Sequence, residues 1–382
     1  MHVQMTSADR HEIRYHRRKQ QRDERRQSKF RKMDSFDCVF SYTNLYRAYK
    51  HCRRGVSWKG SVQAYITQAP LNIHKTYQDL HADRYQSKGS TNFTICERGK
   101  IRHIRSISIE ERIVQRCLCD NSLVPMLKRK FIFDNGAAIK GKGYSFAVSR
   151  TTEHLRRYYR KHGCSGYALL FDFSKFFDRI SHDLLKQLLS DVYSDARILK
   201  LLFYFIDQFG VDGLGLGSQI SQILALSAAD KLDHFIKQQL HIREYGRYMD
   251  DGYLLHPNKQ YLINCMSRIN ELCESLHIVL NKKKTQIVKL TRGFIFIKVR
   301  FMLTRTGRII RRINRRSIRT ARNKLRLLAS RVVNAQSLHD TIQSWISWYG
   351  YAKKFNAWAT INRIKHQTFY IVEYDLGGTM YA

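Results

Sequence analysis

The sequence predicts an α+β fold, in which helical segments are combined with short strands and hairpins. A short apolar run at residues 167–173 (YALLFDF) fits a buried strand. Residues 245–256 (YGRYMDDGYLLH) are typical of a strand, a tight turn and a second strand, with Asp-Asp-Gly at the bend. Between them, residues 218–240 have the pattern of one long helix with small residues along one side.

The length and composition are those of a chain that can bury a large core. Its 382 residues, 43% of them hydrophobic and 12% aromatic, correspond to two or three structural units or to one interlocked unit. The eight cysteines include no CxxC pair and no Cys/His grouping with zinc-binding spacing, which predicts reduced thiols. Neither a signal peptide nor an apolar run of transmembrane length is present, so we expect a cytoplasmic protein without a membrane partner.

The net charge is extreme. There are 68 Lys and Arg against 31 Asp and Glu, which gives +37 and a pI of about 10.1. Self-repulsion at this charge disfavours a compact chain unless a polyanion neutralises it. Nucleic acid is the natural partner, because every neutralised phosphate releases counterions. The alternative from charge alone is a ribosomal-type or membrane-surface protein.

The N-terminal part is predicted to be mainly helical, with one hairpin. Residues 1–34 are rich in Lys and Arg and form either a flexible arm or a helix that becomes ordered on RNA. Residues 35–95 are expected to form short helices. Residues 93–107 alternate like a hairpin with its turn at residues 98–99, and residues 110–130 have helical spacing.

The C-terminal part continues the α+β pattern. Helices are predicted at residues 181–189, with Ser181 as the N-cap, and at residues 263–281. Residues 293–303 are expected to form one strand. Residues 310–328 combine isoleucines and leucines with many arginines and are predicted to form a basic helix.

Three acidic residues need an explanation in so basic a chain. Asp172 lies between two phenylalanines near the end of an apolar run, and Asp250 and Asp251 are adjacent at the predicted hairpin bend. Carboxylates that are brought together repel one another unless hard cations bind between them. Two magnesium ions roughly 3.5–4 Å apart would activate a hydroxyl and stabilise a leaving pyrophosphate. The alternative is an Asp pair in a turn and an unrelated Asp in a strand.

Four segments decide between these readings. The motifs YALLFDFSKFFDRISHDLL, GLGLGSQISQILA, YMDD and LNKKKTQIV follow one another in the order and spacing of the reverse transcriptase family, which the chain resembles over about 260 residues. The resemblance implies a right-hand polymerase with fingers, a palm built on an antiparallel sheet, and a helical thumb. It divides the chain into a basic extension (1–58), fingers (59–165), palm (166–300) and thumb (301–382).

The resemblance also assigns roles to residues near the aspartates. Asp172 and Asp250 would bind the metal ions, Asp251 would complete the carboxylate cluster, and the carbonyl of Phe173 would add a ligand. The cofactor would be two Mg²⁺ ions, with Mn²⁺ as an alternative. Phe177 would lie under the sugar and exclude a 2′-hydroxyl; otherwise it is an ordinary core residue.

The same resemblance predicts contacts to the nucleotide. Lys100 and Arg102, in the hairpin, would bind the triphosphate, a task that suits the planar fork of arginine; the alternative is a solvated basic hairpin. Lys284, among three adjacent lysines, would lie near the leaving pyrophosphate. Gly217 would let the backbone approach the ligand and Gln222 would begin a supporting helix.

Two departures from the common family pattern are informative. Leu216 stands where many relatives have glutamine, and Ser221-Gln222 stands where they have Ser-Pro. Both changes resemble retroelements that generate diversity and some phage-defence enzymes, and Leu216 predicts lower fidelity. The expected activity is RNA-directed DNA synthesis from dNTPs on a structured noncoding RNA, in a bacterial retroelement or anti-phage system. The alternatives are template-independent or protein-primed synthesis, an inactive RNA-binding scaffold, and a basic toxin. An accessory protein or a homo-oligomer stays open.

Overall fold

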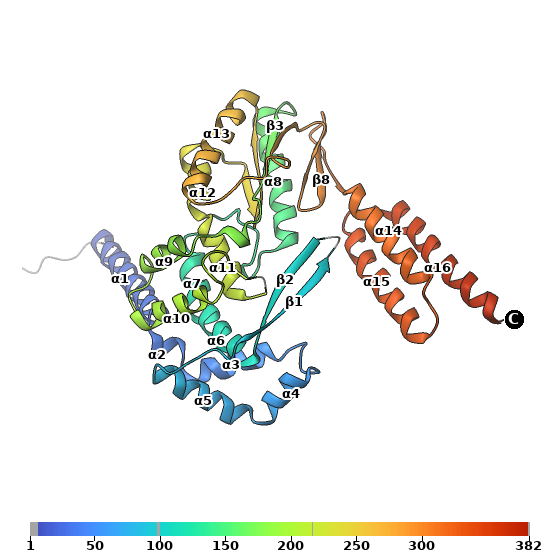
Figure 1. Cartoon of the computed structure of the whole chain (residues 1–382). Coiled ribbons are helices and arrows are strands. Elements are labelled where there is room, and N and C mark those ends of the chain that lie inside the picture. Colours follow the sequence, from blue (N-terminus) through green and yellow to red (C-terminus); the bar gives the residue numbers. More distant parts are fainter. Residues whose placement is uncertain (1–6, 98–99, 216, 381–382) are drawn as a thin grey trace, which may run out of the picture.

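The computed structural model describes the backbone of residues 7–97, 100–215 and 217–380. Within these ranges the side chains of a few positions, including Lys100 and Arg102, lie outside the description. Figure 1 shows a basic helix at one end of the molecule, a body of helices and sheets, and a separate three-helix bundle at the C-terminal end.

The first five elements are helices. The short helices predicted within residues 35–95 are present up to His81. They are α1 (Ser7–Met33), α2 (Phe36–Val39), α3 (Tyr42–Cys52), α4 (Gly60–Thr67) and α5 (Ala69–His81). Of the two predicted forms of the basic N-terminal segment, the structure has the helix. The described side chains of α1 are exposed up to Lys32, because hardly any of them is apolar. The later helices bury apolar residues such as Leu45 and Ile73.

The predicted hairpin is confirmed. Strands β1 (Ser90–Glu97) and β2 (Lys100–Ile107) pair antiparallel, and the predicted turn at residues 98–99 lies outside the described residues. The helical segment that follows is built from α6 (Ile109–Leu118), the π-turn η1 (Cys119–Leu123) and α7 (Val124–Lys128). Ser108 caps α6 by accepting a hydrogen bond from the Glu111 amide at 3.1 Å.

The central sheet has the order β4-β5-β3-β6, and all its pairs are antiparallel. Its strands are β3 (Tyr167–Asp172), β4 (Tyr245–Tyr248), β5 (Asp251–His256) and β6 (Gln286–Lys289). Helices α8 (Tyr144–His162) and α13 (Lys259–Ser275) pack on it. Alternate residues of β3 belong to two different cores, Leu169 to one and Leu170 to the other. Burial on both faces explains why residues 167–171 are continuously apolar.

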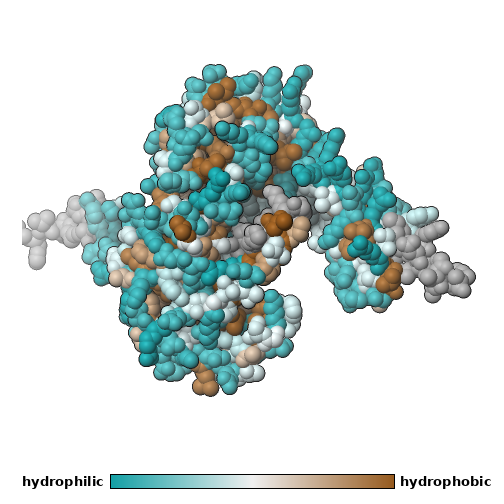
Figure 2. All heavy atoms as spheres, in the orientation of Figure 1, coloured by the Kyte–Doolittle hydropathy of each residue, from teal (hydrophilic) through white to brown (hydrophobic). Residues whose placement is uncertain are grey.

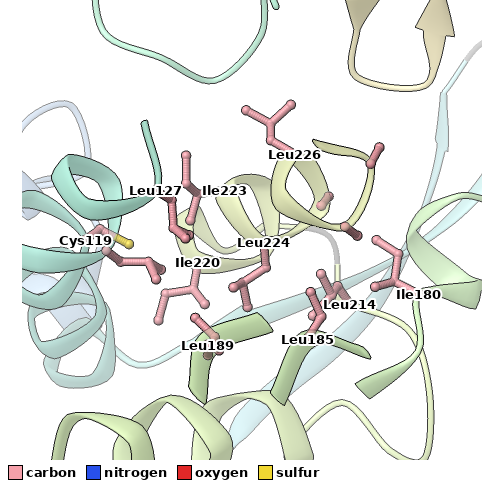
Figure 3. Packing of buried hydrophobic residues seen from close by; sticks show 14 of the residues in the cluster. Cys119, Leu127, Ile180, Leu185, Leu189, Leu214, Ile220, Ile223, Leu224 and Leu226 are labelled. Atoms are coloured by element: carbon pink, nitrogen blue, oxygen red, sulfur yellow. The ribbon is translucent and has the colours of Figure 1, made fainter. Parts of the chain in front are cut away.

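The larger core lies around α11 (Gln219–Ala228), and Figure 3 shows Ile220, Ile223 and Leu224 pointing toward residues of neighbouring helices. These neighbours include α9 (His182–Ser190), which Ser181 caps as predicted, and α10 (Ala196–Asp207). The predicted single helix over residues 218–240 is wrong in one respect. It is interrupted at Ala229 and continues as α12 (Asp230–His234) and the π-turn η3 (Phe235–Gln239).

Two further predictions are corrected near residue 300. Residues 293–303 form two strands rather than one, β7 (Phe294–Phe296) and β8 (Val299–Leu303), because Ile297 and Lys298 adopt positive φ angles of 45° and 68° and reverse the chain. The hairpin buries Phe294 opposite Phe301. The predicted helix over residues 310–328 begins late, since its first residues form β9 (Ile309–Ile313), which pairs with β8.

The C-terminal bundle consists of α14 (Arg315–Ala329), α15 (Ala335–Lys353) and α16 (Trp358–Met380). Asn314 ends β9 and starts α14, since its side chain accepts a hydrogen bond from the Arg316 amide at 3.1 Å. None of the helices described in the structure is long and apolar enough to cross a membrane. All eight cysteines are free, as predicted.

Candidate active site

The sheet brings the three predicted aspartates to one place. Asp172 is the last residue of β3 and lies directly opposite Asp251, the first residue of β5. Tyr248 pairs with Asp251, so Met249 and Asp250 form the turn between β4 and β5. The predicted bend is therefore shifted, because Asp251 and Gly252 already belong to the strand. The amide of Phe173 donates to the carbonyl of Asp250 at 3.1 Å, which ties the turn to the end of β3.

Asp172 is buried, at 4% exposure, and its oxygens are engaged by the segment after α13. The Asn281 side-chain amide donates to Asp172 Oδ1 at 3.1 Å, and the Asn281 backbone amide donates to the Asp172 carbonyl at 2.7 Å. The ammonium of Lys284 donates to Asp172 Oδ2 at 2.5 Å. Among the three adjacent lysines, Lys284 is thus the one that donates to the Asp172 carboxylate, and its predicted place near a leaving pyrophosphate stays a prediction.

The charges in this site are strongly coupled. Burial raises the pKa of Asp251 to about 7, and the charge of Asp250 and the hydrogen bond with Asp172 act in the same direction. Partial burial of Lys284 opposes its charge, but the hydrogen bond to Asp172 and the neighbouring carboxylates outweigh this effect and raise its pKa. The site has an excess of negative charge that one ammonium group offsets only in part.

The chemistry of the donors suits a hard divalent cation. All the candidate ligands are oxygens, the type that Mg²⁺ prefers. Among the described residues, however, no three His, Cys, Asp or Glu side chains are arranged to enclose a metal ion. The backbone places the carboxylates together, while the Lys284 ammonium occupies an oxygen of Asp172 that a metal ion would use.

Phe173 and Phe177 connect the aspartate strand to its surroundings. Phe173 is 2% exposed and forms an isolated β-bridge with Leu280, so its backbone is fixed between the turn and the segment that carries Lys284. Phe177 is half-buried and begins the short helix η2 (Phe177–Arg179). Its carbonyl accepts a hydrogen bond from the Leu214 amide at 2.7 Å, which holds the loop before α11 beside it.

The loop before α11 packs against the hairpin. Gly217 has a φ of 117°, and a Cβ there would lie 3.3 Å from the carbonyl oxygen of Arg105 in β2. The close approach that Gly217 allows is therefore to the backbone of the hairpin. Gln222 is exposed near the start of α11, and its predicted role stays a prediction. Leu216 lies outside the described residues.

For the two residues predicted to bind the triphosphate, the structure describes only the backbone. Lys100 pairs with Glu97, and Arg102 pairs with Ile95, in the β1–β2 register. The side chains of Lys100 and Arg102 lie outside the described residues, so both roles stay predictions.

Sequence reasoning missed Asn281, which makes two hydrogen bonds to Asp172. A signal was present, because Asn281 directly precedes the lysine run in LNKKKT. An isolated Asn at the end of an apolar segment is however also the ordinary residue for a turn, and only the folded arrangement distinguishes the two roles.

Comparison with known proteins shows the family of the chain. The family model described as "Reverse transcriptase (RNA-dependent DNA polymerase)" matches residues 87–328. A search of curated proteins found no match. Among solved structures, telomerase from Candida albicans in complex with the TWJ fragment of telomeric RNA is 13% identical, with a TM-score of 0.47 over 77% of this chain and 61% of that one. Apo telomerase from Candida tropicalis, truncated from its C-terminal domain, is 14% identical, with a TM-score of 0.47 over 59% of this chain and 55% of that one.

The chain therefore spans 61% and 55% of these two telomerase chains. The predicted α+β class and right-hand polymerase fold are confirmed. The family match covers more than half of the 382 residues and includes Asp172, Asp250 and Asp251. The chain belongs to the reverse transcriptase family.

Proposed function

We propose that the protein is an RNA-directed DNA polymerase whose catalytic residues are Asp172, Asp250 and Asp251. The observation that carries the proposal is the register of the central sheet, which pairs Asp172 with Asp251 and ties the turn at Asp250 to the end of β3. In a chain of this family, carboxylates clustered at the end of β3 and the start of β5 support a proposal of two-metal catalysis with Mg²⁺, or with Mn²⁺ in its place.

The residues of the site divide the work. Bound divalent ions would activate the primer 3′-hydroxyl and stabilise the charge on the leaving pyrophosphate. Asp172, Asp250 and the Phe173 carbonyl would hold these ions, and Asp251 would complete the carboxylate cluster. Lys284, which donates to Asp172 in the described arrangement, would turn toward the pyrophosphate and neutralise it there.

Nucleotide selection would involve the hairpin and the loop before α11. Lys100 and Arg102 would bind the triphosphate by charge-assisted hydrogen bonds. Phe177, half-buried beside this loop, would present its ring to the sugar and exclude a ribonucleotide. Leu216, Gly217 and Gln222 would frame the nucleotide and the templating base, and the apolar Leu216 would lower fidelity.

The partners would be an RNA template, the DNA product and dNTPs. Hydrophilic residues predominate on the visible face in Figure 2, in keeping with the charge of +37. In the proposed thumb (301–382), α14 buries Leu325 and Ala329 and exposes a basic face. That face consists of Arg315, Arg316, Arg319, Lys324 and Arg326. Such a surface suits the phosphates of an RNA–DNA duplex, which is read mainly by shape.

The remaining boundaries and the biological setting are part of the proposal. The basic extension (1–58), with the exposed helix α1, would hold template RNA beside the fingers (59–165) and the palm (166–300). We place the enzyme in the cytoplasm of a bacterium, in a retroelement or an anti-phage system with a structured noncoding RNA. Leu216 in the GLGLGS segment supports this setting, because it resembles those two groups of enzymes.

Primer extension tests the activity directly. Wild-type protein should incorporate dNTPs on a primed RNA template in Mg²⁺, and Asp250→Asn should abolish incorporation while it leaves RNA binding within about twofold. Asp183→Asn, which changes an exposed carboxylate on α9, is the matched control and should behave as wild type. Incorporation that survives Asp250→Asn would refute the assignment.

The same preparation separates the alternatives. One structured RNA with attached complementary DNA among the copurifying nucleic acids would support templated synthesis on a dedicated RNA. Product of one repeated sequence, made without added template, would instead indicate untemplated synthesis. A tyrosine attached to the DNA 5′ end would indicate protein priming.

A further inference from the structure

A buried ion pair lies directly behind the turn at Asp250. Arg247 in β4 and Asp233 in α12 are both 0% exposed, and Arg247 is the largest fully buried side chain among the described residues. An isolated charge in the interior is very costly, and even a paired one is often no more stabilising than apolar residues of the same volume. The pair therefore calls for an explanation other than stability.

The guanidinium of Arg247 uses all its nitrogens. Nε donates to Asp233 Oδ1 at 2.7 Å and Nη2 donates to Asp233 Oδ2 at 2.6 Å, a two-pronged pair. Nη2 also donates to the carbonyl of Leu226 at 3.3 Å, in the last turn of α11. Nη1 points the other way and donates to the carbonyl of Met249 at 2.8 Å. Arg247 thus connects the α11–α12 junction to the turn.

The Met249 carbonyl is the important acceptor, because it belongs to the peptide group that precedes Asp250. Met249 has a φ of 55°, a backbone conformation that a side chain with a Cβ adopts at a cost. The peptide group that follows Asp250 is tied as well, since its carbonyl accepts from the Phe173 amide at 3.1 Å. With both flanking peptides fixed, the direction of the Cα–Cβ bond of Asp250 is fixed.

Asp233 fixes the orientation of the Arg247 guanidinium. Its carboxylate also accepts a hydrogen bond from the Tyr245 hydroxyl at 2.5 Å, so three donor groups converge on it. Asp233 lies in α12, one turn after the interruption at Ala229. The acceptor that orients Arg247 thus follows the break in the helix that the sequence pattern did not predict.

From this geometry we infer that Arg247, oriented by Asp233, is a positioning residue that sets the direction of the Asp250 carboxylate. The inference rests on the proposed function, in which Asp250 binds a metal ion. Arg247 touches neither substrate nor metal and acts through the Met249 peptide. Its removal is expected to raise the Mg²⁺ concentration needed for half-maximal dNTP incorporation by about 10- to 100-fold. This is the usual effect of changing a residue that orients a metal ligand.

Three variants separate positioning from plain stabilisation. Arg247→Lys keeps the buried charge pair with Asp233 but replaces the planar fork, which reaches Met249, by a single ammonium group. The triple variant Arg247→Met/Asp233→Leu/Tyr245→Phe replaces the whole cluster by apolar groups, which restores stability if the pair is only structural. Tyr245→Phe alone is the matched control, because it removes a hydrogen bond to Asp233 and leaves the bond to Met249 in place.

Each variant is compared with wild type by hydrogen–deuterium exchange of the peptide that covers residues 248–252, by thermal melting, and by the Mg²⁺ concentration for half-maximal dNTP incorporation. We expect faster exchange and an increase of about tenfold or more in the Mg²⁺ requirement for Arg247→Lys and for the triple variant. Tyr245→Phe should lower the melting temperature but leave the Mg²⁺ requirement unchanged.

Two outcomes would overturn the inference: wild-type exchange and Mg²⁺ requirement in a folded triple variant, or in Arg247→Lys. The exchange measurement does not depend on catalysis. If the wild type makes no DNA, the proposed function fails, while faster exchange of the turn in Arg247→Lys than in Tyr245→Phe would still support the role of Arg247 in holding the turn.

Discussion

The raised pKa of Asp251 predicts how the stability of the metal-free protein depends on pH. The ordinary pKa of 3.8 becomes about 7 in the folded protein, mainly because Asp251 is buried and lies beside Asp250 and Asp172. Between these two values the folded protein holds a proton that the unfolded chain has released. The free energy of unfolding therefore falls as the pH rises, by about 1.4 kcal/mol per pH unit, and levels off above about pH 7.

The variant that isolates this contribution is Asp251→Asn, whose amide carries no charge and still donates a hydrogen bond. From pH 5 to pH 7, wild type should lose about 2 kcal/mol relative to Asp251→Asn, because the slope above has fallen to half by pH 7, where Asp251 is half deprotonated. Above pH 7 the two curves should run parallel. Asp183→Asn, an exposed carboxylate on α9, should follow wild type throughout.

The assay is urea denaturation in EDTA at pH 5, 6, 7 and 8. Far-UV circular dichroism is the appropriate probe, because the four tryptophans, Trp58, Trp345, Trp348 and Trp358, lie outside the central sheet and its helices. Mg²⁺ at pH 8 should restore stability to wild type more than to Asp251→Asn. Wild-type and Asp251→Asn curves that stay parallel from pH 5 to 7 would contradict a raised pKa at this position.

Single substitutions test the roles of Lys284, Gly217, Phe177 and Arg319. Lys284→Met should shift the acidic limb of the pH profile for dNTP incorporation to higher pH, because the Lys284 ammonium lowers the pKa of the nearby Asp251. An unchanged profile would argue against this effect of Lys284 on Asp251. Gly217→Ala should cost about 1–3 kcal/mol in thermal unfolding, more than Gly89→Ala, which has a positive φ but open space; equal losses would exclude the backbone contact. Phe177→Ala should raise ribonucleotide incorporation at least tenfold relative to dNTPs, and an unchanged ratio would assign it to the core. Arg319→Ala should weaken duplex binding and lower its salt dependence by about one counterion; an unchanged salt slope would place Arg319 away from phosphate.

Much of the fold follows from local patterns. The β1–β2 hairpin and the strand β3 could be predicted, because alternating apolar and polar residues indicate a half-buried strand and a short apolar run fits a buried strand. The β7–β8 turn is not readable, because it uses Ile297 and Lys298 at positive φ instead of glycine or asparagine. A turn formed by such residues is imposed by the packing of Phe294 against Phe301, which no local signal records.

The aspartates of the site could be predicted, but their supporting residues could not. Asp172, Asp250 and Asp251 stand out because acidic residues are unexpected in apolar strands of a basic chain. Arg247 does not stand out, since one more arginine among many carries no information until its burial is known. Its partner Asp233 reads as an ordinary polar position of a helix. Their contact joins segments whose pairing depends on the whole fold.

Asp172, Asp250 and Asp251 are proposed to form one carboxylate cluster that holds two divalent ions. This arrangement is tested most directly by anomalous diffraction from crystals of the protein grown with Mn²⁺, a primed RNA template and a non-hydrolysable dNTP. We expect two Mn²⁺ peaks roughly 3.5–4 Å apart, in contact with Asp172 and Asp250 and with the Lys284 ammonium displaced from Asp172. A bound nucleotide with no Mn²⁺ peak between these carboxylates, and Lys284 still on Asp172, would contradict it.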